Sequence, residues 1–371
     1  MIATLLLARV LWGARQQQSD QQYSGAGKLV ILPMRANSPT ILGYKIYFDP
    51  QYPPKDSPKV FGEDKKHWQF EYVATGFVEQ PSGPTLNHFR VFNQEQKPDR
   101  TSQVTRMLLR LWDFNFKKLG FLHPLNYNKG VIDVYLCFGG KAGGEQLFGV
   151  ELYRDKPDIK VNTIYIYDMS SFTDPVEMAR EIAHEYGHAT LPHVGGFESP
   201  EEWADGYLGE KVSLRWMRDA LVKGELTPDD TMGATADGLS AWISKHVDPL
   251  VFRAAQTFPS QAVMGDKSAK GMDAFIGLAL YIDTLYSDVI FRRSMMMIGS
   301  VSAADYPDSV ILAAEEPAQV TLRIPSELIG KQIWIPLGSG QLSGTNIIKK
   351  KSNGWVQILA TKGPIVILNT H

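Results

Sequence analysis

The feature that most constrains this chain is the string His184-Glu185-Tyr186-Gly187-His188, which lies in a stretch from Asp174 to Glu210. On a helix, residues four apart lie one turn apart on the same face, so both imidazoles can reach one ion. A hydrolytic zinc site needs three protein ligands and an open position for water, and a Glu beside the first His can take the proton from that water. Glu185 occupies that position. The string therefore predicts a metal site on a helix.

The residues on either side of the string predict where this helix begins and ends. Asp174, Pro175 and Glu177 form a helix start of the capping-box type. Pro192 and the pair Gly195-Gly196 predict that the helix ends soon after His188. The predicted helix has an apolar side and a polar stripe at helical spacing, the stripe formed by Glu181, His184, Glu185 and His188.

The next segment offers carboxylates for the remaining ligand. Ser199-Pro200-Glu201-Glu202 predicts a second helix start, with Ser199 as the cap and Pro200 at the first helical position. Glu201 and Asp205 are four residues apart. One carboxylate can therefore bind the ion while the other accepts the second N–H of a ligating His and fixes its tautomer.

HEYGH followed by EEWAD resembles the gluzincin branch of the zincin metallopeptidases, whose members pair HExxH with a downstream ExxxD or ExxAD on the next helix. The resemblance implies that His184, His188 and Glu201 are the ligands of one catalytic Zn2+. It also implies Glu185 as the general base and Asp205 as the carboxylate that orients a ligating His. The expected activity is hydrolysis of peptide bonds in a peptide or protein substrate.

Two other interpretations of these residues remain open. Only residues 189 to 200 separate the two motifs, which is shorter than in thermolysin-like members, and His193 is an alternative third ligand. HExxH with a further His is similar to the metzincins, although Leu191 stands where metzincins have Gly and His193 falls one residue early. Glu198 and Glu202 are further alternatives. The other interpretation is that no metal binds, the His pair is structural, and the acidic residues only interact with the helix dipole.

The composition of the chain limits the class of protein to which it can belong. A length of 371 residues and a hydrophobic content of 44% are sufficient for two or three ordinary globular cores. The net charge of −2 gives no argument for nucleic acid or an anionic membrane as a partner. Apart from the short N-terminal run, no stretch approaches the length of a transmembrane anchor. The single Cys137 cannot form an internal disulfide and is expected to be a small buried hydrophobe.

The pattern along the chain predicts four regions. Residues 1–26 are a candidate signal peptide followed by a polar spacer, which predicts an exported protein, secreted or periplasmic. Residues 27–98 are β-rich, and residues 99–300 form the catalytic domain, in which Thr101 to Leu119 is an amphipathic helix. Residues 308–371 form a C-terminal β domain of six short strands, the first of which is SVILAA.

The expected fold class is α+β. A zincin-like catalytic domain, with a mixed sheet, an active-site helix and a mostly helical second lobe, is flanked by the N-terminal β-rich segment and by a small C-terminal β-sandwich or barrel. The resemblance implies that one strand, here placed at Asn162 to Tyr167, runs along the edge of the cleft, where extended substrate can pair with it. The strongest helix of the second lobe is expected from Met272 to Met297.

The predicted function is that of a zinc-dependent metallopeptidase in which Glu185 is the general base toward a metal-activated water. The alternatives are a catalytically idle zincin-like binding or adhesion module, and a zinc hydrolase that acts on a non-peptide amide. A group that stabilises the oxyanion is also needed, and the candidates are Tyr207, His246, Tyr281 and Tyr286. The sequence predicts no particular oligomeric state.

Overall fold

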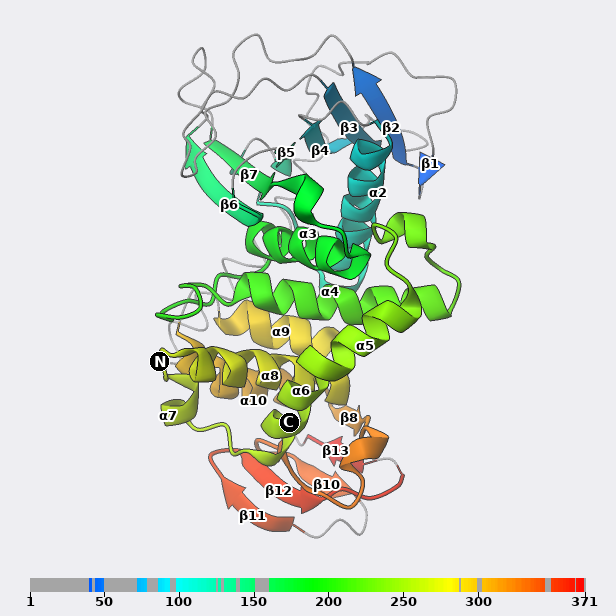
Figure 1. Ribbon diagram of the computed structural model, residues 1–371. Helices are drawn as coiled ribbons and strands as arrows, with labels where there is room; N and C mark the ends of the chain where they lie inside the picture. Colours follow the sequence, from blue (N-terminus) through cyan, green and yellow to red (C-terminus); the bar gives the residue numbers. More distant parts are fainter. Residues whose placement is uncertain are drawn as a thin grey trace. The chain divides into compact units, whose positions relative to one another are not determined.

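The computed structural model describes residues 40–41, 44–49, 72–78, 86–93, 98–124, 126–127, 130–137, 141–150, 160–286, 288–298, 302–343, 348–363 and 365–369. The predicted leader and spacer, residues 1–26, lie outside them. The chain divides into two compact units, whose helices and strands are labelled in Figure 1. The first comprises residues 1–113, 122–190 and 223–235, and the second comprises residues 114–121, 191–222 and 236–371.

The first unit is built on a seven-stranded mixed sheet in the order β1-β2-β3-β4-β5-β7-β6. β4, β5 and β7 are parallel and the remaining pairs are antiparallel. The strands are β1 (Thr40–Ile41), β2 (Tyr44–Asp49), β3 (Tyr72–Val78), β4 (Leu86–Asn93), β5 (Ile132–Leu136), β6 (Gly143–Val150) and β7 (Lys160–Tyr167). One sheet therefore continues through the predicted β-rich region and into the predicted catalytic domain.

The order of the strands corrects one expectation. The segment Asn162 to Tyr167 was expected at the edge of the sheet, but β7 lies between β5 and β6. Among the described strands β6 is the edge strand on that side. The prediction was wrong because both segments alternate like strands, and their order in the sheet depends on pairing between distant residues.

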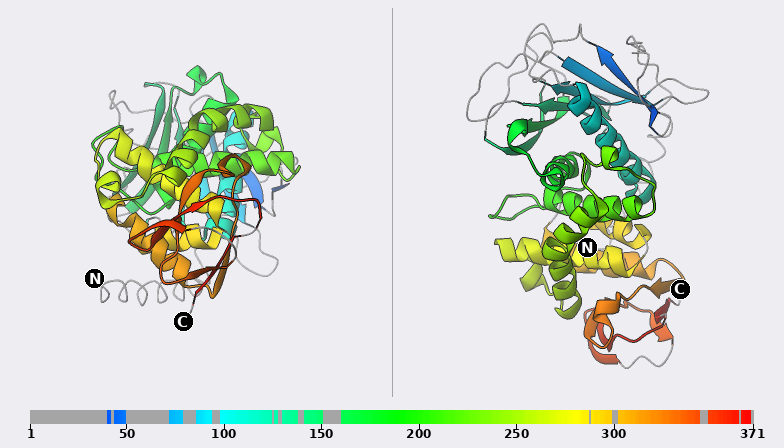
Figure 2. Two further views of the ribbon diagram at one scale, coloured as in Figure 1. Left: turned by 90° about the horizontal axis from the view of Figure 1, so that it is seen from below. Right: turned by 45° about the vertical axis from the view of Figure 1, so that its right-hand side comes forward.

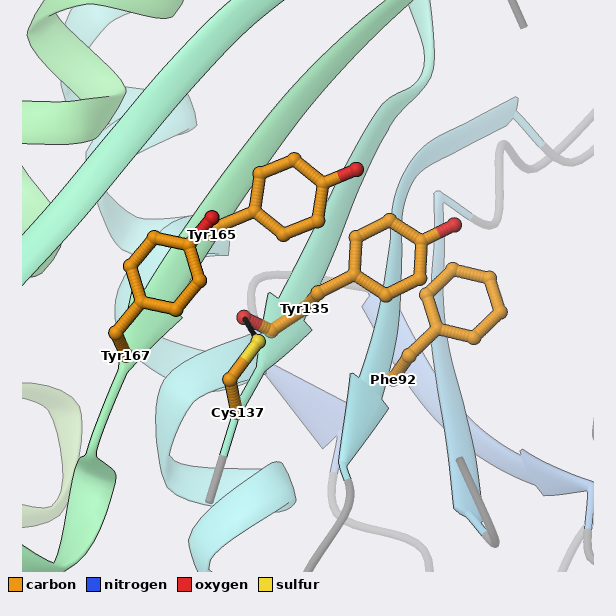
Figure 3. Close-up of a cluster of buried hydrophobic side chains, with 5 residues drawn as sticks. All are labelled: Phe92, Tyr135, Cys137, Tyr165 and Tyr167. Carbon is orange, nitrogen blue, oxygen red and sulfur yellow. Dashed lines mark hydrogen bonds between the residues drawn. The ribbon is translucent and has the colours of Figure 1, made fainter. Parts of the chain in front are cut away.

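A row of stacked aromatic rings crosses the parallel strands of the sheet (Figure 3). Phe92 on β4 stacks on Tyr135 on β5 with ring centroids 4.6 Å apart, and Tyr135 stacks on Tyr165 on β7 at 5.1 Å. These residues are direct cross-strand partners, which is the arrangement in which aromatic pairs stabilise a sheet. Cys137 is buried in this cluster, and burial raises the pKa of its thiol. Its predicted role as a small buried hydrophobe is confirmed.

Two helices of the first unit follow the sequence predictions. The predicted amphipathic helix is α2 (Pro98–Phe114), and a short π-helical segment, η1 (Asn115–Leu119), continues it to Gly120. The helix that carries the His pair is α3 (Pro175–Thr190). Its first turn is capped as expected, because the backbone N–H of Val176 donates to Oδ1 of Asp174 at 2.8 Å.

The sheet fixes the position of α3. The helix packs against β6 and β7, and most of its residues are buried. At its C-terminal end the side-chain amide of Asn162 on β7 donates to the carbonyl oxygen of Ala189 at 2.9 Å, while Gln146 on β6 donates to the Asn162 side chain at 2.8 Å. These bonds satisfy a carbonyl that the helix itself leaves without an intrahelical partner.

The second unit is mostly helical before its C-terminal strands. Its helices are α4 (Asp205–Val222), α5 (Ala236–His246), α6 (Asp248–Gln256), α7 (Gln261–Met264), α8 (Ala269–Leu285), α9 (Asp288–Ile298) and α10 (Tyr306–Glu315). The expected helix from Met272 to Met297 is therefore two helices, and Tyr286 between them has an extended backbone.

The segment SVILAA is helical, contrary to the expectation of a strand. It forms most of α10, which has a Pro in its first turn. The buried residues Tyr306, Val310, Ala313 and Ala314 recur at helical spacing. Short apolar runs of this kind fit a strand or a buried helix equally well, so periodicity alone could not decide between them.

The C-terminal strands, coloured orange to red in Figure 2, form two antiparallel three-stranded sheets. β10 (Gln341–Ser343), β13 (Ile365–Leu368) and β8 (Gln319–Leu322) form one, while β11 (Ile348–Ser352), β12 (Trp355–Leu359) and β9 (Gln332–Pro336) form the other. The mixed α+β class is confirmed. No helix among the described residues combines the length and the apolar character that crossing a membrane requires.

Two buried tyrosines join the helices of the second unit to its C-terminal strands. Tyr281 on α8 donates its hydroxyl hydrogen to the carbonyl oxygen of Trp334 on β9, and Tyr286 donates to that of Pro336, each at 3.0 Å. Because these groups are fully buried, losing a hydroxyl leaves a polar group desolvated without one of its partners.

We expect Tyr281→Phe and Tyr286→Phe each to lower the free energy of unfolding by about 1 to 3 kcal/mol. Urea unfolding followed by circular dichroism measures this. Tyr127→Phe is the control, since the Tyr127 ring contacts Phe148 in the first unit, and it should change stability by less than about 0.5 kcal/mol. Unfolding of both Tyr→Phe variants at the wild-type urea concentration would contradict the role given to these bonds.

Candidate metal centre

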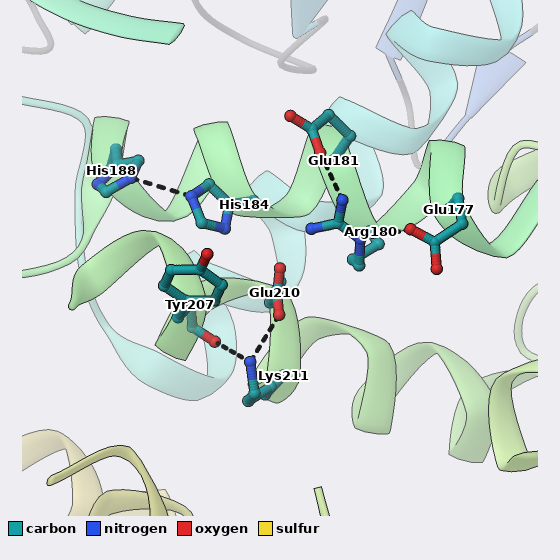
Figure 4. A network of polar contacts seen from close by, with 8 residues as sticks. All are labelled: Glu177, Arg180, Glu181, His184, His188, Tyr207, Glu210 and Lys211. Atoms are coloured by element: carbon teal, nitrogen blue, oxygen red, sulfur yellow. Dashed lines mark hydrogen bonds and ion pairs between the residues drawn. The ribbon is translucent and has the colours of Figure 1, made fainter. Parts of the chain in front are cut away.

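The two histidines of α3 present the same ring nitrogen to each other (Figure 4). Nε2 of His184 and Nε2 of His188 are 3.2 Å apart, and their rings are inclined at 77°. Two nitrogens bound at 2.0–2.1 Å to a tetrahedral zinc ion lie roughly 3.3 Å apart. The pair therefore has the separation that two ligands of one ion need.

Glu201 offers a third candidate ligand atom. The ligand atoms of His184, His188 and Glu201 all lie within 4.8 Å of one another. Among the described residues this is the group of His, Cys, Asp and Glu side chains close enough together to hold a metal ion, and His193, Glu198 and Glu202 are not in it. The donor set of two imidazoles and one carboxylate suits zinc.

Glu201 lies on a loop and not on the expected helix. α4 begins at Asp205, so Ser199 does not cap a helix there, and the Ser199–Pro200 peptide bond is cis. The loop is closed by its own backbone pairing. Phe197 N–H donates to Glu202 O at 3.3 Å, Ala204 N–H donates to Val194 O at 2.9 Å, and Gly195 pairs with Trp203. This pairing, which the local helix signals did not indicate, holds the segment on either side of Glu201.

Asp205 is the first residue of α4 and is almost completely buried. Its Oδ2 lies 2.5 Å from Nδ1 of His193. The resemblance implied that Asp205 orients a metal-ligating His, whereas this contact is made with the His that was considered as an alternative ligand. The contact fixes the orientation of the His193 ring next to Trp203, whose ring centroid is 5.5 Å away.

The predicted general base, Glu185, is buried against the edge strand. A Cβ atom placed on Gly144 of β6 would lie 2.5 Å from both Cγ and Oε1 of Glu185. The backbone of β6 can therefore approach this carboxylate so closely only because residue 144 is Gly. One turn before His184 on the polar stripe, Glu181 pairs with Arg180 at 2.7 Å, and Arg180 also pairs with Glu177 (Figure 4).

A buried histidine behind α3 was not found from the sequence. Nε2 of His123 lies 2.9 Å from the hydroxyl of Tyr186, the residue between Glu185 and Gly187, and Nδ1 lies 2.9 Å from the carbonyl oxygen of Gly130. Burial lowers the pKa of His123 to about 4, and the Gly130 bond opposes this shift only in part. Because His123 and Tyr186 are far apart in the chain, no spacing signal connects them.

Two of the candidates for the group that stabilises the oxyanion already donate their hydroxyl hydrogens to backbone carbonyl oxygens. Tyr281 and Tyr286 are fully buried and donate to carbonyls of β9, and burial raises both of their pKa values. His246 is exposed on α5, where its ring contacts Trp242. Tyr207 is half-buried on α4, with the Lys211 ammonium 4.8 Å from the centre of its ring. Tyr207 and His246 therefore remain as candidates.

Lys211 itself forms a nearly buried cluster on α4 (Figure 4). Its ammonium group lies 2.6 Å from Oε1 of Glu210 and 3.5 Å from the carbonyl oxygen of Tyr207. An ion pair with so little exposure is costly to form and strongly destabilising to break. It therefore restrains the first turns of α4, which carry Asp205 and Tyr207.

No protein family matches the sequence, and no curated protein sequence matches it. Among solved structures the chain is similar to dipeptidyl-peptidase III from Corallococcus sp. strain EGB, with a TM-score of 0.27 and 10% sequence identity. The similarity covers 74% of this chain and 54% of that chain. The chain thus spans about half of that structure, and the inference of function rests on the geometry of the site.

The low pKa of His123 predicts how stability depends on pH. An unfolded His has a pKa near 6.5, so the folded state disfavours the proton. Stability is complete above about pH 6.5 and falls as the pH decreases toward 4. For this single group the loss between pH 7 and pH 5 is about 2 kcal/mol.

The measurement compares unfolding free energies at pH 7 and pH 5 for the wild type and His123→Gln. The variant should lose about 2 kcal/mol less than the wild type over this interval. His246→Gln, which changes the exposed His of α5, should behave as the wild type. An equal loss in the wild type and in His123→Gln would show that His123 is not held neutral in the folded protein.

Proposed function

We propose that this protein is a zinc-dependent hydrolase, and specifically a peptidase, in which His184, His188 and Glu201 hold one Zn2+. The observation that carries the proposal is the approach of three ligand atoms to within 4.8 Å, together with the 3.2 Å separation of the two Nε2 atoms. A purely structural His pair needs neither a shared point of approach nor a carboxylate beside it.

The residues of the chain have separate parts in the reaction. Zinc would supply Lewis acidity, which makes water acidic near neutral pH and polarises a carbonyl group. Glu185, next to His184 on α3, accepts a proton from water and passes it to the leaving amine. Only 4% of the Glu185 surface is exposed. Electrostatic interactions between this carboxylate and neighbouring charges are therefore stronger than they would be in water.

The edge strand supports a peptide as the substrate. β6 is the edge of the sheet among the described strands, and its residue Gly144 lies against Glu185. An extended peptide can add to a sheet edge through backbone hydrogen bonds. A chain bound to β6 would therefore pass close to the general base.

Two further parts of this proposal rest on the sequence alone. They are that the protein is exported and that Asp205 orients a ligating His.

Purified protein should contain about one zinc ion per chain, measured by elemental analysis after dialysis against metal-free buffer. His188→Asn and Glu201→Ala should each reduce the zinc content to below roughly a tenth of this, because the loss of one of three protein ligands leaves too few to retain the ion. His246→Asn, at an exposed His on α5, is the control and should keep the metal. Wild-type zinc content in Glu201→Ala would remove Glu201 from the ligand set.

Glu185→Gln should lower kcat/KM for peptide hydrolysis by a factor of roughly 100 to 10,000, because an amide cannot accept the proton. The zinc content should be unchanged. Cleavage of unfolded casein, followed by mass spectrometry, is the assay. Glu181→Gln changes a carboxylate on the same polar stripe and should retain activity within about tenfold. Equal activities of wild type and Glu185→Gln, or none in either, would favour a binding module.

A further inference from the structure

A pocket of about 290 Å³ lies in the second unit beside the loop that carries Glu201. Its apolar lining includes Phe197, Met264 and Ala303, all of which are buried, and Trp203, whose surface is 38% exposed. A partly exposed aromatic side chain at the wall of a concave surface is a feature that ligand-binding pockets share. None of these residues belongs to the proposed ligand set.

The Trp203 wall of the pocket is held in place on two sides. Residue Gly195 pairs with Trp203, and a Cβ atom on Gly195 would lie 2.5 Å from Cε3 and Cζ3 of the indole. The indole therefore rests directly on the backbone of residue 195. The His193 ring contacts it at 5.5 Å, and His193 is itself held by Asp205. A wall fixed before binding costs little conformational entropy when a ligand binds.

The charged residues of the pocket do not select a charged occupant. Asp266 accepts a hydrogen bond from the backbone N–H of Ser268 at 2.8 Å, just before α8 begins, and this bond lowers the pKa of its carboxyl group. Lys267, the next residue, carries the opposite charge and contributes its backbone carbonyl oxygen to the N–H of Glu198 at 2.7 Å. Two adjacent exposed charges of opposite sign largely cancel at a distance.

One short loop both lines the pocket and carries the proposed zinc ligand Glu201. Glu201 lies between Phe197 and Trp203, and the Phe197 N–H donates to the carbonyl oxygen of Glu202 at 3.3 Å. The volume of about 290 Å³ falls just below the range for ligand sites, about 300 to 1,000 Å³. It suits a single amino-acid side chain better than a whole small-molecule ligand.

We propose that this pocket is a specificity subsite that takes one large apolar or aromatic side chain of the substrate peptide. This proposal rests on the proposed function, because the loop that lines the pocket also carries Glu201, the proposed third ligand. The Trp203 indole forms one wall, and Phe197, Met264 and Ala303 contribute apolar surface that an occupant would cover. Peptides with Phe or Leu at the corresponding position are preferred over those with Ala, Lys or Asp.

The experiment measures binding without turnover. Zinc-loaded Glu185→Gln protein is titrated in a calorimeter with acetylated and amidated hexa-alanine peptides in which Phe, Leu, Lys or Asp replaces each Ala in turn. At one position Phe and Leu should tighten binding by roughly tenfold or more relative to Ala. Trp203→Ala, and Gly195→Ala, whose new methyl group displaces the indole, should each remove this preference in the Glu185→Gln background.

Phe116→Ala is the matched control, since Phe116 is an aromatic of the same unit with 48% of its surface exposed, and it should leave the preference unchanged. Should Trp203→Ala fail to fold, Trp203→Phe tests the same wall and should reduce the preference without removing it. Zinc content at the wild-type level in each variant shows that a lost preference arises in the pocket and not at the metal.

The outcomes separate this proposal from the proposed function. Equal preferences in the parent, Trp203→Ala and Gly195→Ala, a preference for Lys or Asp, or no binding of any peptide would each overturn the subsite. Hydrolysis by the wild type without a preference dependent on Trp203 would leave the hydrolase standing and remove the subsite. Selective binding through Trp203 with no hydrolysis by the wild type would support the pocket and remove the hydrolase.

Discussion

The candidate site depends first on one helix held rigidly against one sheet. Two imidazole nitrogens 3.2 Å apart can serve one ion only if the helix between them is regular, and α3 is regular because both of its ends are fixed. Asp174 satisfies an N–H of the first turn, and Asn162 satisfies a carbonyl of the last. Between these ends α3 buries its apolar side against β6 and β7. Precise placement of a few side chains by packing in this way is what a metal site requires.

The sequence correctly predicted the structural features that local interactions determine. The start of α3 at Asp174, its end before Pro192 and the approach of His184 to His188 all follow from signals within one or two turns of helix. The α+β class also followed from the alternation of strand-like and helical patterns. Such features need no knowledge of distant residues, which explains why they could be predicted from one sequence without related sequences.

The errors came where distant residues decide the structure. Ser199, Pro200 and Glu202 have the composition of a helix start, yet pairing of Val194, Gly195 and Phe197 with residues 202–204 holds this segment as a loop. β6 takes the edge position because it pairs with β7, which the alternation of either strand does not reveal. The contact of His123 with Tyr186 joins residues 63 apart in the sequence. Tertiary pairing overrode local propensity in the first case and supplied information absent from the sequence pattern in the others.

The loop from 191 to 204 combines two requirements that limit its sequence. It must carry Glu201 at the position of a third ligand, and its Gly195 must allow the Trp203 indole to rest on the backbone. A helix beginning at Ser199 would break the Gly195–Trp203 pair, since helical residues direct their N–H groups along the axis and not toward a neighbouring strand. The loop conformation therefore couples ligand placement to the apolar wall. Substitutions at Gly195 and at Trp203 change the wall and leave the proposed ligands in place, which allows recognition of a side chain to be separated from binding of the metal.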